Sequence, residues 1–200
     1  MAAKRTAKNA LAFALAVAVT FSLSACANDS LADQFRAGDN KNYIAGDGTV
    51  SEFAAENRGK SIAWSGETES GGLLKSDQLS GVVVVMNFWY AGCAPCRAEA
   101  PDLVAVNNMF VGKNVQFVGV NVRDTAETAR AFDRNFKITW PSIIDAQSGS
   151  AVLAFTGVVT PQAVPTTLVI DKQGRVAARV LGQIEKSTLK ALIQRVVDEK

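Results

Sequence analysis

Cys93 and Cys96 are the residues of this sequence best suited to chemistry, because only two residues separate them. At this spacing both sulfurs meet within one helical turn, so one thiolate can attack a partner's disulfide and the other can resolve the mixed disulfide. The 200-residue chain has no histidine and one further cysteine, Cys26. Without histidine, the usual imidazole ligands of zinc, copper and haem iron are missing, as is every Ser–His or Cys–His pair. We therefore expect no metal site, and no cofactor other than a redox-active Cys93–Cys96 disulfide.

The segments around the pair predict a strand-to-helix junction. Residues 82–89 are apolar except for Asn87, which is typical of a strand buried on both faces. Residues 95–111 predict a helix, in which Pro95 is tolerated because the first turn needs no internal N–H donor. A cysteine at a helix N-terminus faces unpaired N–H groups and the positive end of the helix dipole, which favour the thiolate and lower the thiol pKa.

Glu99 is the third candidate, three residues after Cys96 and near the same helix face. If burial raises its pKa, this carboxyl can shuttle the proton of Cys96 during resolution of a mixed disulfide. The alternative is a glutamate in the first turns of a helix that only favours the helix dipole.

The rest of the body alternates strands and helices, which predicts an α/β fold with a mixed sheet and helices on both faces. A turn signal at 171–174 predicts a hairpin. The expected strands are 61–64, 71–74, 82–89, 115–122, 142–144, 166–170 and 175–181, and the expected helices are 95–111, 125–136 and 185–198, with a helical turn at 151–155.

The first segment predicts export. A positive start is followed by an apolar stretch, residues 10–23, which is short for a membrane-spanning helix that needs ~20 residues. It ends in Leu23-Ser24-Ala25-Cys26, similar to a bacterial lipobox, so we expect residues 1–26 to be a lipoprotein signal peptide with Cys26 lipidated. An ordinary signal peptide or an uncleaved anchor is the alternative. Residues 27–57 are polar and turn-rich and predict a tether, which leaves 58–200 as the folded domain.

The composition argues against a disordered chain and against a nucleic-acid-binding protein. Apolar residues make up 48% and charged residues 20% of the chain, a globular balance. The formal net charge is +2, and several of the positive charges lie in the first eight residues. Nothing resembles the basic stripe that nucleic-acid binding requires.

Two segments carry a resemblance to a known family. Residues 86–101, Met-Asn-Phe-Trp-Tyr-Ala-Gly-Cys-Ala-Pro-Cys-Arg-Ala-Glu-Ala-Pro, resemble the active-site segment of the membrane-tethered thioredoxin-like proteins of the ResA/TlpA group, which are AhpC/TSA-related. Residues 164–171, Val-Pro-Thr-Thr-Leu-Val-Ile-Asp, are similar to the family's cis-proline loop and following strand. The likeness extends from about Ser61 to the C-terminus.

The resemblance implies a thioredoxin-like fold with an N-terminal β-hairpin and a helix–strand insertion at residues 124–144. It implies catalysis by Cys93 and Cys96 with Glu99 as acid–base group, and substrate binding by a cis-proline loop of Val164, Pro165 and Thr166. The expected activity is reduction of disulfides in exported proteins, such as apocytochrome c, by a lipoprotein on the outer face of the cytoplasmic membrane. A transmembrane electron donor would recharge the pair.

Alternatives remain at this stage. The same fold supports a disulfide-forming oxidant, and the cysteines of a tethered binding or assembly module would merely stabilise a loop. Tyr90 stands where a peroxiredoxin has Thr or Ser, and Arg97 stands where a haem-attachment site has histidine. Gly92 departs from the Trp that the family commonly has before the first cysteine, which makes partner choice and reduction potential less transferable.

Overall fold

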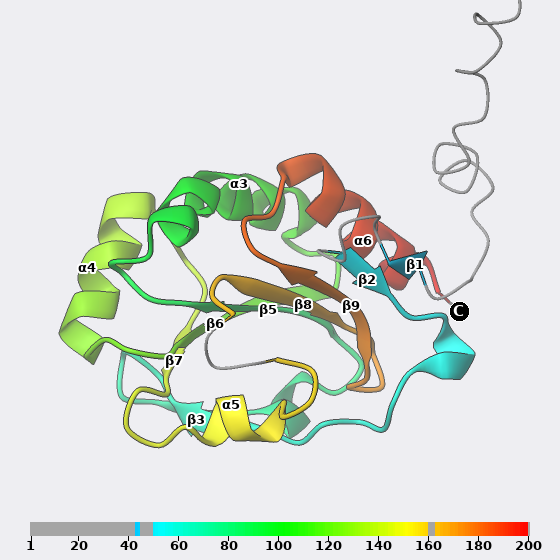
Figure 1. Ribbon diagram of the computed structural model, residues 1–200, viewed down its shortest axis with the longest axis horizontal. Coiled ribbons are helices and arrows are strands. Elements are labelled where there is room, and N and C mark those ends of the chain that lie inside the picture. The colour runs from blue at the N-terminus through cyan, green and yellow to red at the C-terminus, as the bar shows by residue number, and fades with distance from the viewer. Residues whose placement is uncertain (1–42, 45–49, 160–162, 200) are drawn as a thin grey trace, which may run out of the picture. The chain divides into compact units, whose positions relative to one another are not determined.

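The computed structural model describes residues 43–44, 50–159 and 163–199, and its centre is a seven-stranded sheet (Figure 1). The strand order is β1-β2-β9-β8-β5-β6-β7. The strands are β1 (Tyr43–Ile44), β2 (Val50–Glu52), β5 (Val83–Trp89), β6 (Val115–Asn121), β7 (Ser142–Ile144), β8 (Thr166–Ile170) and β9 (Val176–Leu181). β5, β6 and β7 are parallel to one another and the remaining neighbours are antiparallel, so the sheet is mixed as predicted.

β5 is the central strand, and all seven of its residues are buried. It pairs with β6 on one side and β8 on the other, so neither edge is free, and helices or loops cover both faces. This explains the nearly continuous apolar run. Its one polar residue, Asn87, lies opposite Thr167 of β8.

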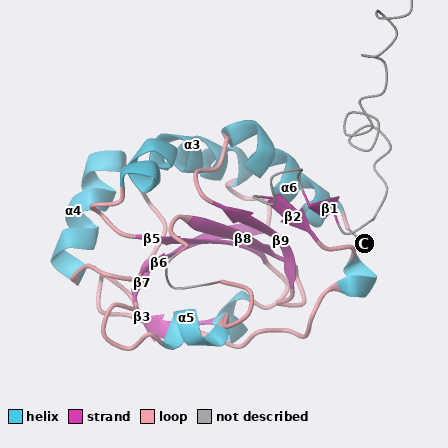
Figure 2. Ribbon diagram, viewed as in Figure 1, coloured by secondary structure: helices cyan, strands magenta, loops and turns pink. Residues whose placement is uncertain are grey.

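Helices cover both faces of the sheet, as Figures 1 and 2 show. α3 (Ala94–Phe110) and α6 (Lys186–Asp198) lie above the sheet, and α5 (Ser150–Ala154) lies below it. α4 (Ala126–Phe136) connects β6 to β7, which is the predicted insertion. Each face has its own apolar core: Leu103, Val106 and Phe110 of α3 pack with α6 in one, and Phe88 packs with Phe155 in the other. The predicted thioredoxin-like α/β fold is confirmed.

The predicted N-terminal hairpin exists, but its first strand was placed wrongly. The prediction assigned a strand to 61–64, whereas the hairpin consists of β3 (Ser65–Glu67) and β4 (Leu73–Lys75). The prediction missed β3 because its central residue is Gly66, and glycine weakens the pattern by which a strand is recognised in a sequence. The glycine is needed there, because a Cβ atom would come 2.2 Å from Cγ2 of Ile143 in β7.

The folded domain begins before residue 58, so the predicted tether is too long at its C-terminal end. β2 pairs with β9 inside the predicted tether, and a short 3-10 helix follows at Ala55–Asn57. The predicted signal peptide, Cys26 and the first part of the tether lie outside the described residues. In the part that the structure does describe, no helix has the length and apolar character needed to cross a membrane.

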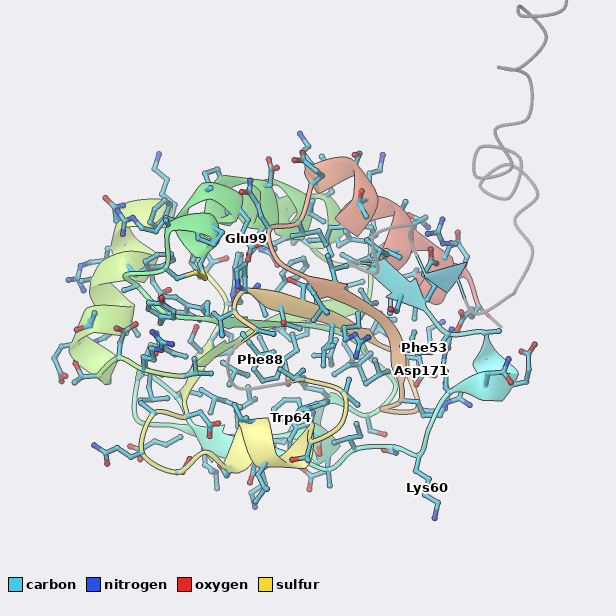
Figure 3. The ribbon with its side chains drawn as sticks, viewed as in Figure 1. Phe53, Lys60, Trp64, Phe88, Glu99 and Asp171 are labelled. Atoms are coloured by element: carbon cyan, nitrogen blue, oxygen red, sulfur yellow. A yellow bond between two sulfur atoms is a disulfide. The ribbon has the colours of Figure 1, made fainter. Side chains whose placement is uncertain are left out.

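Arg58 fastens this early segment to the end of the chain. Its guanidinium bonds to Asp171 at 2.9 Å and to both carboxylate oxygens of Glu199 at 2.5 and 2.6 Å. The Arg58 and Asp171 side chains are only 3% and 2% exposed, so removal of the cation leaves a buried carboxylate short of one partner. Figure 3 labels Asp171 beside Phe53, whose carbonyl oxygen accepts a further bond from Arg58.

We expect Arg58→Met to lower the free energy of unfolding by about 3 kcal/mol, because Asp171 stays buried with Arg175 as its remaining cation. Urea unfolding of the disulfide-bonded protein measures this. Arg195→Met is the matched control: its pair with Glu52 is half-exposed, and its loss should cost less than about 1 kcal/mol. Equal effects of the two variants would contradict the role given to Arg58.

Candidate active site

The two cysteines form a disulfide at the start of α3. Cys93 is the N-cap residue of the helix, and the backbone N–H of Cys96 donates to its Sγ at 3.2 Å. Pro95 falls in the first turn, where its missing N–H costs no helical bond. The cysteines are 3% and 2% exposed, while Gly92, Ala94 and Pro95 around them are exposed. The predicted junction is therefore present, with the sulfur pair just beneath the surface.

The turn that leads from β5 into Cys93 is held by Asp124. Its Oδ2 accepts bonds from the Ala91 N–H at 2.6 Å and from the Asn121 side-chain amide at 2.8 Å. Asn121 ends β6 and Asp124 follows it, so the adjacent parallel strand supports the turn. Neither residue was predicted from the sequence to belong to the site. Their position at the end of a predicted strand could have indicated them, because the carboxyl ends of parallel strands meet at the same edge of a sheet.

The predicted cis-proline loop lies against the disulfide. The Val164–Pro165 peptide bond is cis, and Val164 packs against the cluster that contains both cysteines and Trp89. Val164 is half-buried, whereas Pro165 and Thr166 are buried. The Thr166 hydroxyl donates to the carbonyl oxygen of Ala163 at 2.5 Å. The Thr166 side chain thus secures the loop from inside, and Val164 presents the loop to the cysteine pair.

Glu99 lies inside the molecule with no exposed surface. Its carboxylate accepts a bond from the Asn87 side-chain amide at 2.9 Å and another from the Ile184 backbone N–H at 3.0 Å. The Asn87 amide also donates to Thr167 Oγ1 at 3.0 Å, two residues beyond Pro165. Figure 3 shows Glu99 pointing from α3 towards the sheet, on the side where the yellow disulfide is drawn. A hydrogen-bonded chain therefore joins α3, β5 and the strand that begins at the cis-proline loop.

Burial raises the pKa of Glu99 from 4.5 to about 7, although the bonds from Ile184 and Asn87 lower it in part. At this pKa the carboxyl exchanges protons near neutral pH, which suits an acid–base group. The role of Glu99 as an acid–base group stays a prediction, and its full burial is the condition that the prediction required for a raised pKa.

The sequence also matches a known protein family. The model of the AhpC/TSA family matches residues 53–179, more than half of the chain. The chain belongs to the AhpC/TSA family.

Two proteins of similar sequence carry names that describe thiol–disulfide exchange. The thiol-disulfide oxidoreductase ResA of Geobacillus thermodenitrificans is 31% identical over 116 residues, which cover 58% of this chain and 64% of that protein. The thiol:disulfide interchange protein HelX of Rhodobacter capsulatus is 29% identical over 114 residues, 57% of this chain and 60% of that protein. The chain therefore spans less than two thirds of the length of these two relatives.

Two solved structures match a larger share of this chain than the two sequence relatives do. A DsbF homologue from Corynebacterium diphtheriae has a TM-score of 0.68 and 32% identity, covering 79% of this chain and 99% of that one. A secreted thiol-disulfide isomerase from Corynebacterium glutamicum has a TM-score of 0.70 and 27% identity, covering 81% of this chain and 100% of that one. Both support the thioredoxin-like α/β fold of this chain.

Gly92 is where this AhpC/TSA protein leaves the expected pattern. The residue is exposed, and a Cβ atom there would touch only the ring of Tyr90, at 3.5 Å. The position is therefore sterically open, and the fold does not require a glycine there.

Proposed function

We propose that this protein is an extracytoplasmic thiol–disulfide oxidoreductase that reduces disulfides in exported proteins. The observation that carries the proposal is the Cys93–Cys96 disulfide, capped at a helix N-terminus, packed against the cis-proline loop and close in sequence to a buried carboxyl with a pKa of about 7. The names of the ResA and HelX relatives support exchange of thiols and disulfides as the activity.

In the first step the reduced Cys93 thiolate attacks one sulfur of the substrate disulfide. A new bond forms between Cys93 Sγ and that sulfur, and the substrate's other sulfur leaves as a thiolate. The helix N-terminus supports the Cys93 thiolate with unpaired N–H groups and the helix dipole. Val164 supports this step by position, since it lies half-exposed against the pair and can contact the arriving chain.

In the second step the Cys96 thiolate attacks Cys93 Sγ and restores the disulfide seen here. The substrate's second sulfur leaves as a thiolate, so two electrons pass from the cysteine pair to the substrate. The two substrate thiolates take up protons from solvent, and the one proton of the pair, that of Cys96, is transferred within the protein. Glu99, three residues beyond Cys96 on α3, accepts the Cys96 proton, directly or through water, before the attack. A carboxyl with a pKa of about 7 suits this exchange.

The reaction leaves the pair oxidised, so the cycle needs a reductant. We assign this role to a dithiol of a transmembrane electron carrier, which would exchange with the disulfide in the reverse sense. Export with Cys26 lipidated would hold the domain on the outer face of the cytoplasmic membrane, and apocytochrome c is the proposed substrate. The pair itself is the only redox group the proposal requires, so we propose no cofactor or metal.

A peptide with an oxidised Cys-x-x-Cys-His segment, as in apocytochrome c, tests the activity. Reduced protein should generate two peptide thiols per Cys93–Cys96 disulfide formed, counted by alkylation and mass spectrometry. Oxidation of the dithiol peptide by the disulfide form, with no reduction in the other direction, would instead identify a disulfide donor. Absence of exchange in both directions would contradict catalysis and favour a tethered binding module.

A further inference from the structure

Two arginines, Arg97 of α3 and Arg123 after β6, contact the turn that leads into Cys93, and neither has a part in the exchange chemistry. We propose that Arg97 and Arg123 form a cationic rim that selects substrates with acidic side chains next to the reactive disulfide. This inference rests on the proposed function and names the substrate class of the same site. The term arginine rim is used below for these two residues.

Arg97 lies over the start of the active-site turn. Its Nη1 donates to the carbonyl oxygen of Ala91 at 3.2 Å, two residues before Cys93. Its guanidinium carbon is 5.2 Å from the ring centroid of Phe136 and 5.9 Å from that of Phe132, both in α4. The side chain is exposed, so these contacts fix the cation in position while its outer face stays in water.

Arg123 holds the same turn from another element. It follows β6, and its guanidinium carbon lies 4.2 Å from the ring centroid of Tyr90. The Tyr90 carbonyl oxygen accepts the N–H of Cys93 at 3.1 Å, so Tyr90 is bonded to the first residue of the pair. Both cations therefore contact the segment that leads into Cys93, Arg97 through Ala91 and Arg123 through Tyr90.

The carboxylates nearest to these arginines in the chain are engaged elsewhere. Asp124 accepts bonds from Ala91 and Asn121, and Glu127 pairs with Arg130 at 3.1 Å. Glu99 is buried. Within the described ranges, neither Arg97 nor Arg123 forms an ion pair with a carboxylate. The two positive charges of the rim are thus available to a docked chain.

Apart from the arginine rim, the exposed residues next to the cysteine pair carry no charge, and the nearby Asp124 carboxylate is half-buried and bonded to Ala91 and Asn121. Gly92, Ala94 and Pro95 are the exposed residues immediately around the pair. Because these three side chains are small and uncharged, the two exposed guanidiniums are the groups beside them that can discriminate between substrate sequences by charge. Rim charges act mainly on the rate of encounter and on its salt dependence, so the preference should appear in the second-order rate constant.

Three disulfide-bonded peptides of equal length test the arginine rim, with Glu, Ser or Lys flanking each cysteine. At low ionic strength the wild-type protein should reduce the Glu peptide about tenfold faster than the Lys peptide, and salt of about 0.5 M should shrink this ratio to threefold or less. In Arg97→Gln/Arg123→Gln the ratio should fall to within about twofold of unity, and Arg97→Glu/Arg123→Glu should invert it. Arg134→Gln is the matched control, an exposed arginine of α4 outside the turn, and should keep the wild-type ratio.

The ratio of the rates on the Glu and Lys peptides separates substrate preference from cysteine reactivity, because a change in cysteine reactivity alters both rates alike. The proposed role of the arginine rim would be wrong if the wild-type protein reduced the Glu and Lys peptides at equal rates. It would also be wrong if the double Gln variant kept the wild-type ratio of these rates. Either result would leave the proposed function intact. Failure of the wild-type protein to reduce even the Ser peptide would overturn the proposed function, and this inference with it.

Discussion

Cys93→Ser is expected to abolish disulfide reduction, with a fall in rate of at least about 1,000-fold, because a serine hydroxyl is not ionised near neutral pH and cannot replace the thiolate nucleophile. Cys96→Ser should behave differently. Cys93 keeps its place at the helix N-terminus and still attacks, but nothing resolves the product, so a mixed disulfide with substrate accumulates. Non-reducing gels and mass spectrometry of variant–peptide mixtures measure both outcomes.

Thermal unfolding of both variants in the reduced state, beside the reduced wild-type protein, controls for loss of fold. Retention of full exchange activity by Cys93→Ser would contradict the roles proposed here. A mixed disulfide that accumulates with Cys93→Ser rather than Cys96→Ser would reverse the assignment of attacking and resolving cysteine.

Glu99→Gln is expected to remove a strong pH dependence of stability. The folded pKa of about 7 exceeds the ordinary value of 4.5, so the folded state keeps a proton that the unfolded state has lost in this range. Stability from this group is complete below about pH 4.5 and is lost as the pH rises through about 7. Two to three pKa units correspond to about 3 kcal/mol, which the wild-type protein should lose between about pH 4.5 and pH 8 in addition to the loss seen in the Gln variant. Burial also raises the pKa of Asp133 to about 7, and this second group acts equally in both proteins.

Urea unfolding of the oxidised proteins across this pH range measures the difference. Glu127→Gln is the matched control, because Glu127 is exposed on α4 and its loss should leave the pH slope unchanged. Glu99→Gln should also slow disulfide exchange by about 100-fold near neutral pH, since the proton acceptor for Cys96 is gone. Identical pH profiles of wild type and Glu99→Gln would show that the carboxyl titrates normally.

Local patterns predicted the chemical centre well. The apolar run of β5, the Cys-x-x-Cys spacing and the helix after it gave the junction that positions Cys93. The helix predicted at 185–198 is present as α6, and it buries Leu189, Leu192, Ile193 and Val196. These features succeed because neighbouring residues determine them: strand burial, helical spacing and the start of a helix are read within a dozen positions.

Long-range contacts were not predictable in the same way. Ile184 donates to Glu99 across 85 residues, and β2 joins the sheet through β9, although its surroundings read as a polar tether. No local pattern encodes either partner. The hairpin strand β3 was missed because Gly66 meets a steric demand from Ile143, a residue far away in the sequence.

The reduction potential of the Cys93–Cys96 pair tests the central claim most directly. It is measured by equilibrating the protein in thiol buffers of known potential and trapping the free thiols. A value near or below about −250 mV, on the thioredoxin side of the scale, is the result expected of a reductant of exported proteins. A value above about −150 mV, towards the strongly oxidising end, would contradict that direction and make the protein a disulfide donor.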